Sequence, residues 1–113
     1  MNASLPLCVI DAVFSLGARY ESTERTVRDW CKRYGWPMAR AEAPKEYSIT
    51  DFLNVLQPYE NHWEDMAHNV FDNRQRTSTR SGILKAEAVY RFSEVLQRFG
   101  IETFAECSEI RSA

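Results

Sequence analysis

One segment of this sequence concentrates positive charge and hydroxyl groups, and no acidic residue interrupts it between Asn73 and Glu87. Its candidate contact residues are Arg74, Arg76, Thr77, Ser78, Arg80, Ser81 and Lys85. Guanidinium groups, hydroxyl groups and the free N–H groups at a helix start all bind phosphate well. The segment therefore predicts phosphate contacts, with nucleic acid as the leading partner. The competing interpretation is a solvated loop whose arginines pair with nearby acids.

A second candidate contact lies earlier in the chain, where Arg19 and Tyr20 follow an apolar segment and precede a polar one. At the tip of a turn, a tyrosine ring can stack on a nucleobase and an arginine can reach into a groove. The competing interpretation is that the tyrosine ring covers the edge of the core. Whether either candidate can contact a partner depends on the helices and turns that position its side chains.

The composition limits the class of protein. The chain has 113 residues with 44% hydrophobic and 27% charged residues, which predicts one globular domain over residues 1–113. Its formal net charge is -2, so any nucleic-acid contact must come from one basic face and not from bulk charge. We find no signal peptide and no apolar run long enough to span a bilayer, and we expect no membrane partner. The chain is predicted to be cytoplasmic.

Signatures of catalysis and of metal or cofactor binding are missing from the sequence. The isolated cysteines Cys8, Cys31 and Cys107 form no CxxC pair, which signals neither a zinc site nor a disulfide framework. His68 and Asp72 have the i, i+4 spacing of a ligand pair, but two ligands are too few for a metal site. We therefore assign no catalytic residue, no metal ligand and no cofactor from the sequence.

The periodicity of apolar residues predicts an all-α fold, an orthogonal bundle of about five to six helices. The expected helices span about residues 5–16, 22–34, 48–57, 61–71 and 83–99, with a short last one from 101. Helix starts are expected at Ser4, at Ser22 or Thr23, and at the capping-box pairs Ser48/Asp51 and Asn61/Glu64. Gly35 and Gly100 are expected to end helices. One apolar face is expected on the last long helix, formed by Leu84, Ala88, Phe92, Val95, Leu96 and Phe99.

Three stretches of the chain resemble a known family. They are Phe14-Ser15-Leu16-Gly17-Ala18-Arg19-Tyr20, the helix from Ser22, and Thr79-Arg80-Ser81-Gly82-Ile83-Leu84-Lys85-Ala86-Glu87. Together they are similar to the N-terminal half of helix-hairpin-helix DNA glycosylases, the endonuclease III-like (HhH-GPD) superfamily. The segment from Gly100 to Phe104 is similar to the family's link toward its hairpin.

The resemblance implies a role in base-excision DNA repair. In the family, the turn after the first helix faces duplex DNA, and the matching residues here are Arg19 and Tyr20. The family's Leu-Pro-Gly-x-Gly hairpin, its catalytic Lys or Asp and the four cysteine ligands of some members are absent from this sequence. The resemblance thus implies a DNA-binding part that is truncated before the hairpin and inactive as a glycosylase by itself.

Two other functions remain open from the residues. The chain can be a non-enzymatic DNA-binding module that uses the basic segment for phosphate contacts. It can also be a protein-interaction module, because an incomplete domain exposes an apolar face for self-association or for a partner that completes the domain.

Overall fold

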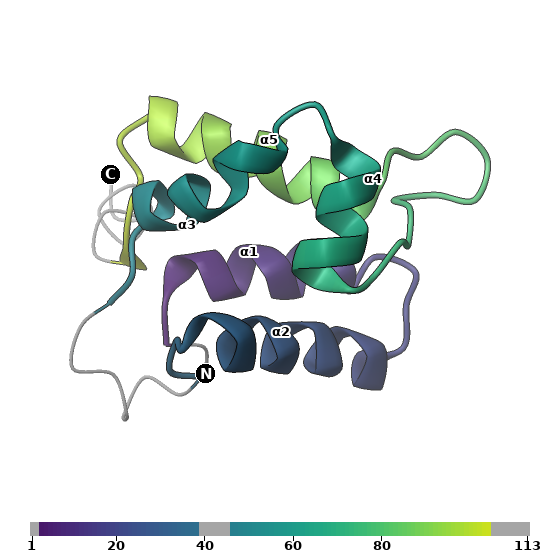
Figure 1. Ribbon diagram of the computed structural model, residues 1–113, viewed down its shortest axis with the longest axis horizontal. Coiled ribbons are helices and arrows are strands. Elements are labelled where there is room, and N and C mark those ends of the chain that lie inside the picture. The colour runs from purple at the N-terminus through teal and green to yellow at the C-terminus, as the bar shows by residue number, and fades with distance from the viewer. Residues whose placement is uncertain (1–2, 39–45, 105–113) are drawn as a thin grey trace.

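The protein folds as a bundle of helices (Figure 1), which confirms the expected all-α class. The computed structural model describes residues 3–38 and 46–104. The elements are α1 (Leu5–Phe14), α2 (Tyr20–Tyr34), α3 (Ile49–Leu56), a 3-10 helix (Gln57–Tyr59), α4 (Trp63–Met66), a π-helix (Ala67–Phe71) and α5 (Lys85–Arg98). Within these ranges, extended pairing is limited to an isolated antiparallel bridge between Arg76 and Leu84.

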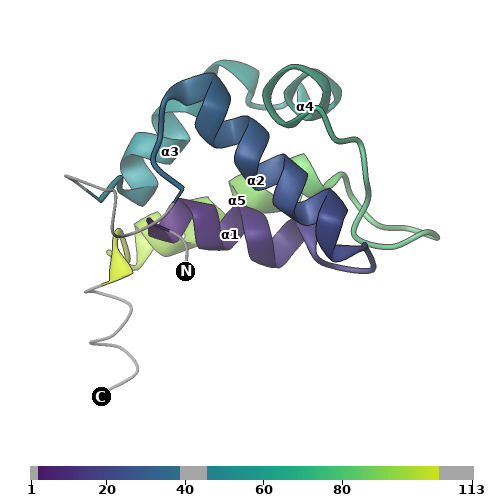
Figure 2. The same ribbon diagram turned by 90° about the horizontal axis from the view of Figure 1, so that it is seen from below.

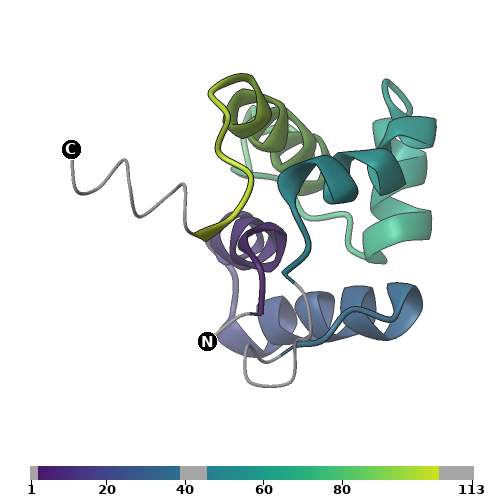
Figure 3. The same cartoon turned by 90° about the vertical axis from the view of Figure 1, so that its left-hand side faces the viewer.

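Helix α1 is the central element of the bundle. It packs against α2, α5 and α3, and the end-on view shows α1 between α2 on one side and α3 and α5 on the other (Figure 3). This position explains why α1 is apolar nearly all round, since a helix with neighbours on several sides has little surface for polar residues. The turn after α1 and the long loop before α5 lie at the same end of the bundle (Figures 1 and 2).

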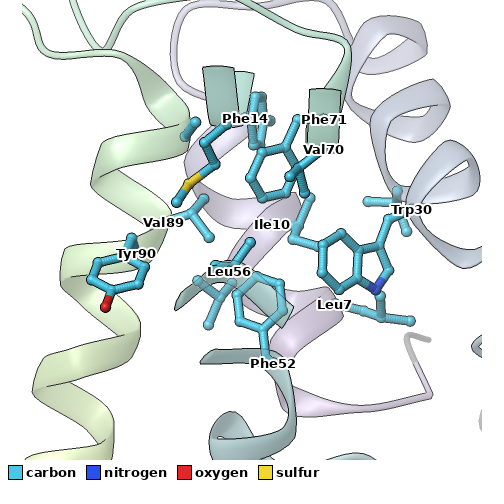
Figure 4. Packing of buried hydrophobic residues seen from close by; sticks show 14 of the residues in the cluster. Leu7, Ile10, Phe14, Trp30, Phe52, Leu56, Val70, Phe71, Val89 and Tyr90 are labelled. Carbon is cyan, nitrogen blue, oxygen red and sulfur yellow. The ribbon is translucent and has the colours of Figure 1, made fainter. Parts of the chain in front are cut away.

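The core is built around the buried indole of Trp30 in α2 (Figure 4). Its ring centroid lies 4.9 Å from that of Phe52 and 5.7 Å from that of Phe71. Phe14 of α1 joins the cluster at 5.2 Å from Phe71. Large aromatic side chains contribute most of the apolar area a small domain can bury, so this cluster links α1, α2, α3 and the π-helix in one core.

Two local signals are confirmed. Gly35 ends α2 in the left-handed conformation, with φ of 70°, where a residue with a Cβ would be strained. The capping box at the start of α3 is complete: Asp51 N–H donates to Ser48 Oγ at 3.0 Å, and Ser48 N–H donates to Asp51 Oδ2 at 2.9 Å. Each bond satisfies a backbone N–H that lacks a partner within the helix.

The predicted start of the second helix is wrong. Helix α2 begins at Tyr20 with Arg19 as its N-cap, and not at Ser22 or Thr23. The hydroxyl of Thr23 donates instead to Phe14 O at 3.1 Å. Ser4 precedes α1 as expected, but its side chain forms no cap bond. Tertiary contacts compete with local caps for the same hydroxyl groups, and the contact with α1 takes the Thr23 hydroxyl here.

The capping box expected from Asn61 and Glu64 does not form. His62 is the N-cap of α4 and makes no side-chain cap bond. Asn61 instead has a positive φ of 68°, in the left-handed region that asparagine tolerates better than most residues. The helix that follows also changes its hydrogen bonding from α to π after Met66.

The most consequential difference concerns the face that α5 buries. Of the expected apolar face, Leu84 is buried and Leu96 packs against the core, but Phe92, Val95 and Phe99 are 51%, 43% and 71% exposed. The buried residues of α5 are Lys85, Ala86, Val89, Tyr90 and Ser93. The buried face thus mixes apolar and polar side chains, and periodicity alone does not distinguish it from the exposed face.

The end of α5 is as predicted. Gly100 follows α5 with φ of 73°, as expected of a residue that ends a helix. The expected short last helix, like Cys107, falls mostly outside the described residues. No helix in the described ranges combines the length and the apolar character needed to cross a membrane.

Burial of the Cys31 thiol predicts a loss of stability in alkali. Burial raises the pKa of this thiol from 9.0 to about 11. Between these values the unfolded thiol ionises while the folded one stays protonated, so rising pH favours unfolding. We expect a loss of up to roughly 2–3 kcal/mol between pH 9 and 11, measured by urea denaturation. The variant Cys31→Ala should lack this component, and an unchanged pH slope would contradict the assignment.

Candidate nucleic-acid interface

The loop between the π-helix and α5 is closed by backbone hydrogen bonds. Thr77 N–H donates to Ile83 O at 2.9 Å, and Lys85 N–H donates to Gln75 O at 2.8 Å. These bonds flank the Arg76–Leu84 bridge and bring the two sides of the loop together. A Cβ on Gly82 would lie 2.1 Å from Ser78 N, so only glycine permits this close approach. The paired residues 75–77 and 83–85 therefore form a stem that holds the tip of the loop.

The first side of the loop is anchored to α2 by two amide side chains. Asn73 Nδ2 donates to Thr26 Oγ1 at 3.0 Å, and Gln75 Nε2 donates to Ser22 Oγ at 3.1 Å. Asn73 is itself buried, and its Oδ1 accepts from Gln75 N–H at 2.9 Å. Arg74 lies between the two anchors, which places it alongside the first turns of α2.

Lys85 is buried, at 1% exposure, and is not the surface cation that the sequence predicts. Its ammonium donates to Phe14 O at 2.9 Å, to Leu16 O at 2.6 Å and to Gln75 Oε1 at 2.9 Å. These bonds use the three donors of an ammonium group. Burial lowers the pKa of Lys85. A direct phosphate contact would require breaking these bonds, so the predicted role of Lys85 is corrected to a structural one.

Arg76 is also used within the loop. Its guanidinium donates to Gly82 O at 3.1 Å and lies 3.6 Å from a carboxylate oxygen of Glu64. Both side chains are more than half exposed, and an exposed ion pair of this length contributes little stability. Arg76 therefore supports the loop but keeps exposed guanidinium surface.

The other predicted cations are exposed at one end of the molecule. Arg19, Arg74 and Arg80 are exposed and form no salt bridge with any other described residue. The phenol ring of Tyr20 is 68% exposed at the start of α2. We call this surface the turn–loop face, and it consists of Arg19, Tyr20, Arg74, Ser78, Thr79, Arg80 and Ser81. Thr77, also predicted as a contact, is only half-buried and lies on the stem.

Two surface hollows lie within or beside the turn–loop face. One, of about 410 Å³, lies between the turn (Leu16 and Gly17) and the loop (Ser78 and Thr79). The other, of about 650 Å³, lies at the start of α2 and is lined by Arg19, Glu21, Ser22 and Arg25. The α2 N-terminus has no side-chain cap, so its first N–H groups are not occupied by a capping side chain. The structure thus brings both predicted segments together.

Sequence reasoning missed the residues that assemble this face. Gln75 and Asn73 read as ordinary loop residues, although an asparagine in a turn often bonds a backbone N–H two residues on. Lys85 carried a clearer signal. A cation in the first turn of a helix is unfavourable for that helix's dipole, which indicates that its position serves some other contact.

No chemical step can be assigned to this surface. Within the part of the chain that the structure describes, no three His, Cys, Asp or Glu side chains form a group that could hold a metal ion. His62 and His68 are exposed. The arrangement can bind anions through guanidinium, hydroxyl and backbone N–H groups, and it can offer one aromatic ring for stacking.

Comparison with known proteins gives a family for the whole chain. Residues 1–113 match the family described as Domain of unknown function (DUF8548). The chain belongs to this family. No curated protein and no solved structure matches it at a significant level.

The buried Lys85 ammonium predicts a large effect on stability. We expect Lys85→Met to lower the free energy of unfolding by roughly 2–4 kcal/mol, because two backbone carbonyls would be left without a charged donor. Urea denaturation at neutral pH measures this loss. The matched control is Lys32→Met at an exposed position, for which we expect a change within about 0.5 kcal/mol. Equal effects of the two substitutions would contradict the buried role of Lys85.

Proposed function

We propose that this protein binds duplex DNA through the turn–loop face. The observation that supports this most is the convergence of two basic segments that are far apart in the sequence. Arg19 follows α1 and Arg74 and Arg80 lie before α5, yet Lys85 and Gln75 join the two segments at one end of the bundle. Exposed guanidinium groups without acidic partners are suited to phosphate oxygens.

The electrostatics of the chain fit a local DNA contact. The protein has a formal net charge of -2, so a non-specific attraction over its whole surface is not expected. Acids adjoin the face, with Glu21 beside Arg19, Glu64 paired with Arg76 and the exposed Asp72 two residues before Arg74, but none of them forms a salt bridge with Arg19, Arg74 or Arg80. The exposed cations can therefore release counterions from DNA, the term that dominates non-specific affinity.

Tyr20 and the start of α2 add contacts of a different kind. The exposed Tyr20 ring can stack on an unpaired base or lie against a groove. A phosphate bound between Arg19 and Arg25 would lie at the N-terminus of α2, where the helix dipole favours an anion. Hydroxyl groups of Ser78 and Ser81 offer further phosphate contacts from the loop side.

The resemblance to helix-hairpin-helix DNA glycosylases supports the same face, since the matching turn in that family contacts DNA. We propose that the chain acts as the DNA-contacting part of a base-excision-type protein. No residue is assigned a catalytic role.

Removal of two exposed arginines tests the DNA-binding proposal. We expect the double variant Arg74→Ala and Arg80→Ala to bind a short labelled duplex about tenfold more weakly at low salt. The slope of log affinity against log salt should fall by about 1 for each phosphate that the variant no longer reaches. The measurement is fluorescence anisotropy across a salt series.

The matched control for this experiment is Arg98→Ala. Arg98 is also exposed, but it lies in the last turn of α5, at the opposite end of that helix from Lys85. It should leave both affinity and salt slope unchanged. Absence of binding by the unaltered chain, or equal losses in both variants, would contradict the proposal.

A second candidate function is protein association through α5. Phe92, Val95 and Phe99 form an exposed apolar stripe on this helix, and exposed apolar patches commonly mark interaction sites. Val89 and Ser93 of the same helix are buried in the bundle, so the exposed stripe lies beside the buried face of α5.

Replacing the phenylalanines of the stripe tests this second function. We expect the unaltered chain to sediment as a larger species with rising concentration, and Phe92→Ser with Phe99→Ser to remain monomeric. Because both side chains are more than half exposed, the stability measured by urea should change little. A monomer at every concentration would leave self-association without support and would restrict this function to a different partner protein.

A further inference from the structure

We infer that Lys85 and Gln75 act as a positioning pair, which holds the turn after α1 at a fixed place relative to the loop before α5. This inference rests on the proposed function, because the two segments it joins carry the two halves of the turn–loop face. Neither residue of the pair contacts the nucleic acid itself.

A continuous set of hydrogen bonds connects the two halves of the face. Lys85 Nζ donates to Leu16 O at 2.6 Å, three residues before Arg19. The same ammonium donates to Gln75 Oε1 at 2.9 Å, and Gln75 is flanked in sequence by Arg74. Gln75 Nε2 completes the connection by donating to Ser22 Oγ of α2 at 3.1 Å. Lys85 and Gln75 therefore connect the two halves directly, in addition to the separate anchor of the loop through Asn73 and Thr26.

The geometry leaves Lys85 no part in direct binding. Its side chain is 1% exposed, and its three N–H donors are occupied by two backbone carbonyls and one amide oxygen. Lys85 can affect DNA affinity in a folded protein through the residues it positions and through its charge, and a change at the neutral Gln75 isolates the positioning effect. A group held in its binding geometry beforehand loses less conformational entropy on association.

The turn depends on this tether more than its sequence suggests. Leu16 is half exposed and Gly17 adopts a φ of 62°. The turn's own backbone bonds, Leu16 N–H to Val13 O and Ala18 N–H to Ser15 O, are local and do not reach the loop. Without the Lys85 ammonium, the Leu16 carbonyl would bond to water, and the turn would sample more orientations. Arg19 and the loop arginines would then seldom reach adjacent phosphates together.

A double-mutant cycle on DNA affinity tests the positioning role. The variants are Lys85→Met, Arg19→Ala and their combination, each measured by anisotropy with the same labelled duplex at a temperature where circular dichroism shows them folded. We expect Lys85→Met alone to weaken binding by about three- to thirtyfold. In the Arg19→Ala background the same substitution should weaken binding much less, because the side chain it positions is already gone.

The variant Gln75→Ala provides the test if Lys85→Met does not fold. It retains the two bonds from Lys85 to the α1 carbonyls and removes only the connection to the loop and to Ser22. We expect weaker DNA binding with nearly unchanged thermal unfolding, and again a smaller effect in the Arg19→Ala background. The control Gln97→Ala, at an exposed glutamine near the far end of α5, should not change affinity.

The outcomes separate this inference from the proposed function. Additive losses of affinity in the cycle, or unchanged affinity of folded Lys85→Met and Gln75→Ala, would overturn the positioning role while leaving DNA binding intact. Failure of the unaltered chain to bind the duplex would overturn the proposed function and this inference with it. Non-additive losses of affinity in both cycles would support it.

Discussion

The arrangement of this protein depends on one buried ammonium group. Lys85 begins α5, and its side chain ends against the carbonyl groups of Phe14 and Leu16 at the C-terminal end of α1. The last carbonyls of a helix have no partner within it and carry partial negative charge. A cation at this position donates hydrogen bonds to these carbonyls and compensates their partial negative charge. Because the cation is buried, removing the interaction is costly in stability. This interaction joins the end of the central helix and the turn after it to the start of α5 and the loop before it.

Arg33 plays a comparable part at another helix end. Its guanidinium reaches from the last turn of α2 to the carbonyls of Asn69 and Val70 in the π-helix, with the latter bond at 2.9 Å. The π-helix ends at Phe71, and Asp72, the residue after it, has a positive φ of 48°. Lys85 and Arg33 thus each bond to carbonyl groups near the end of a helix that is distant in the sequence. Positive charge in this chain is therefore divided between residues that hold the bundle and residues that remain exposed.

This division shapes the proposed interface. Lys85 and, in part, Arg76 are committed to contacts within the protein, whereas Arg19, Arg74 and Arg80 remain exposed around them. The structural cations hold the backbone in place, and the exposed ones are thereby presented together. A protein with a net charge of -2 can in this way carry a local surface suited to phosphate without an excess of basic residues.

The sequence by itself determined features that depend on a few neighbouring residues: the all-α class, the end of α2 at Gly35, and the capping box of Ser48 and Asp51. Such features form because the bonding partners lie within one or two turns of each other. Only the tertiary structure decided that α5 exposes Phe92 and buries Lys85, and that Thr23 bonds to α1 instead of capping α2. These outcomes depend on which surfaces meet, since a side chain is buried or exposed according to what packs against it, and local spacing carries no information about that neighbour.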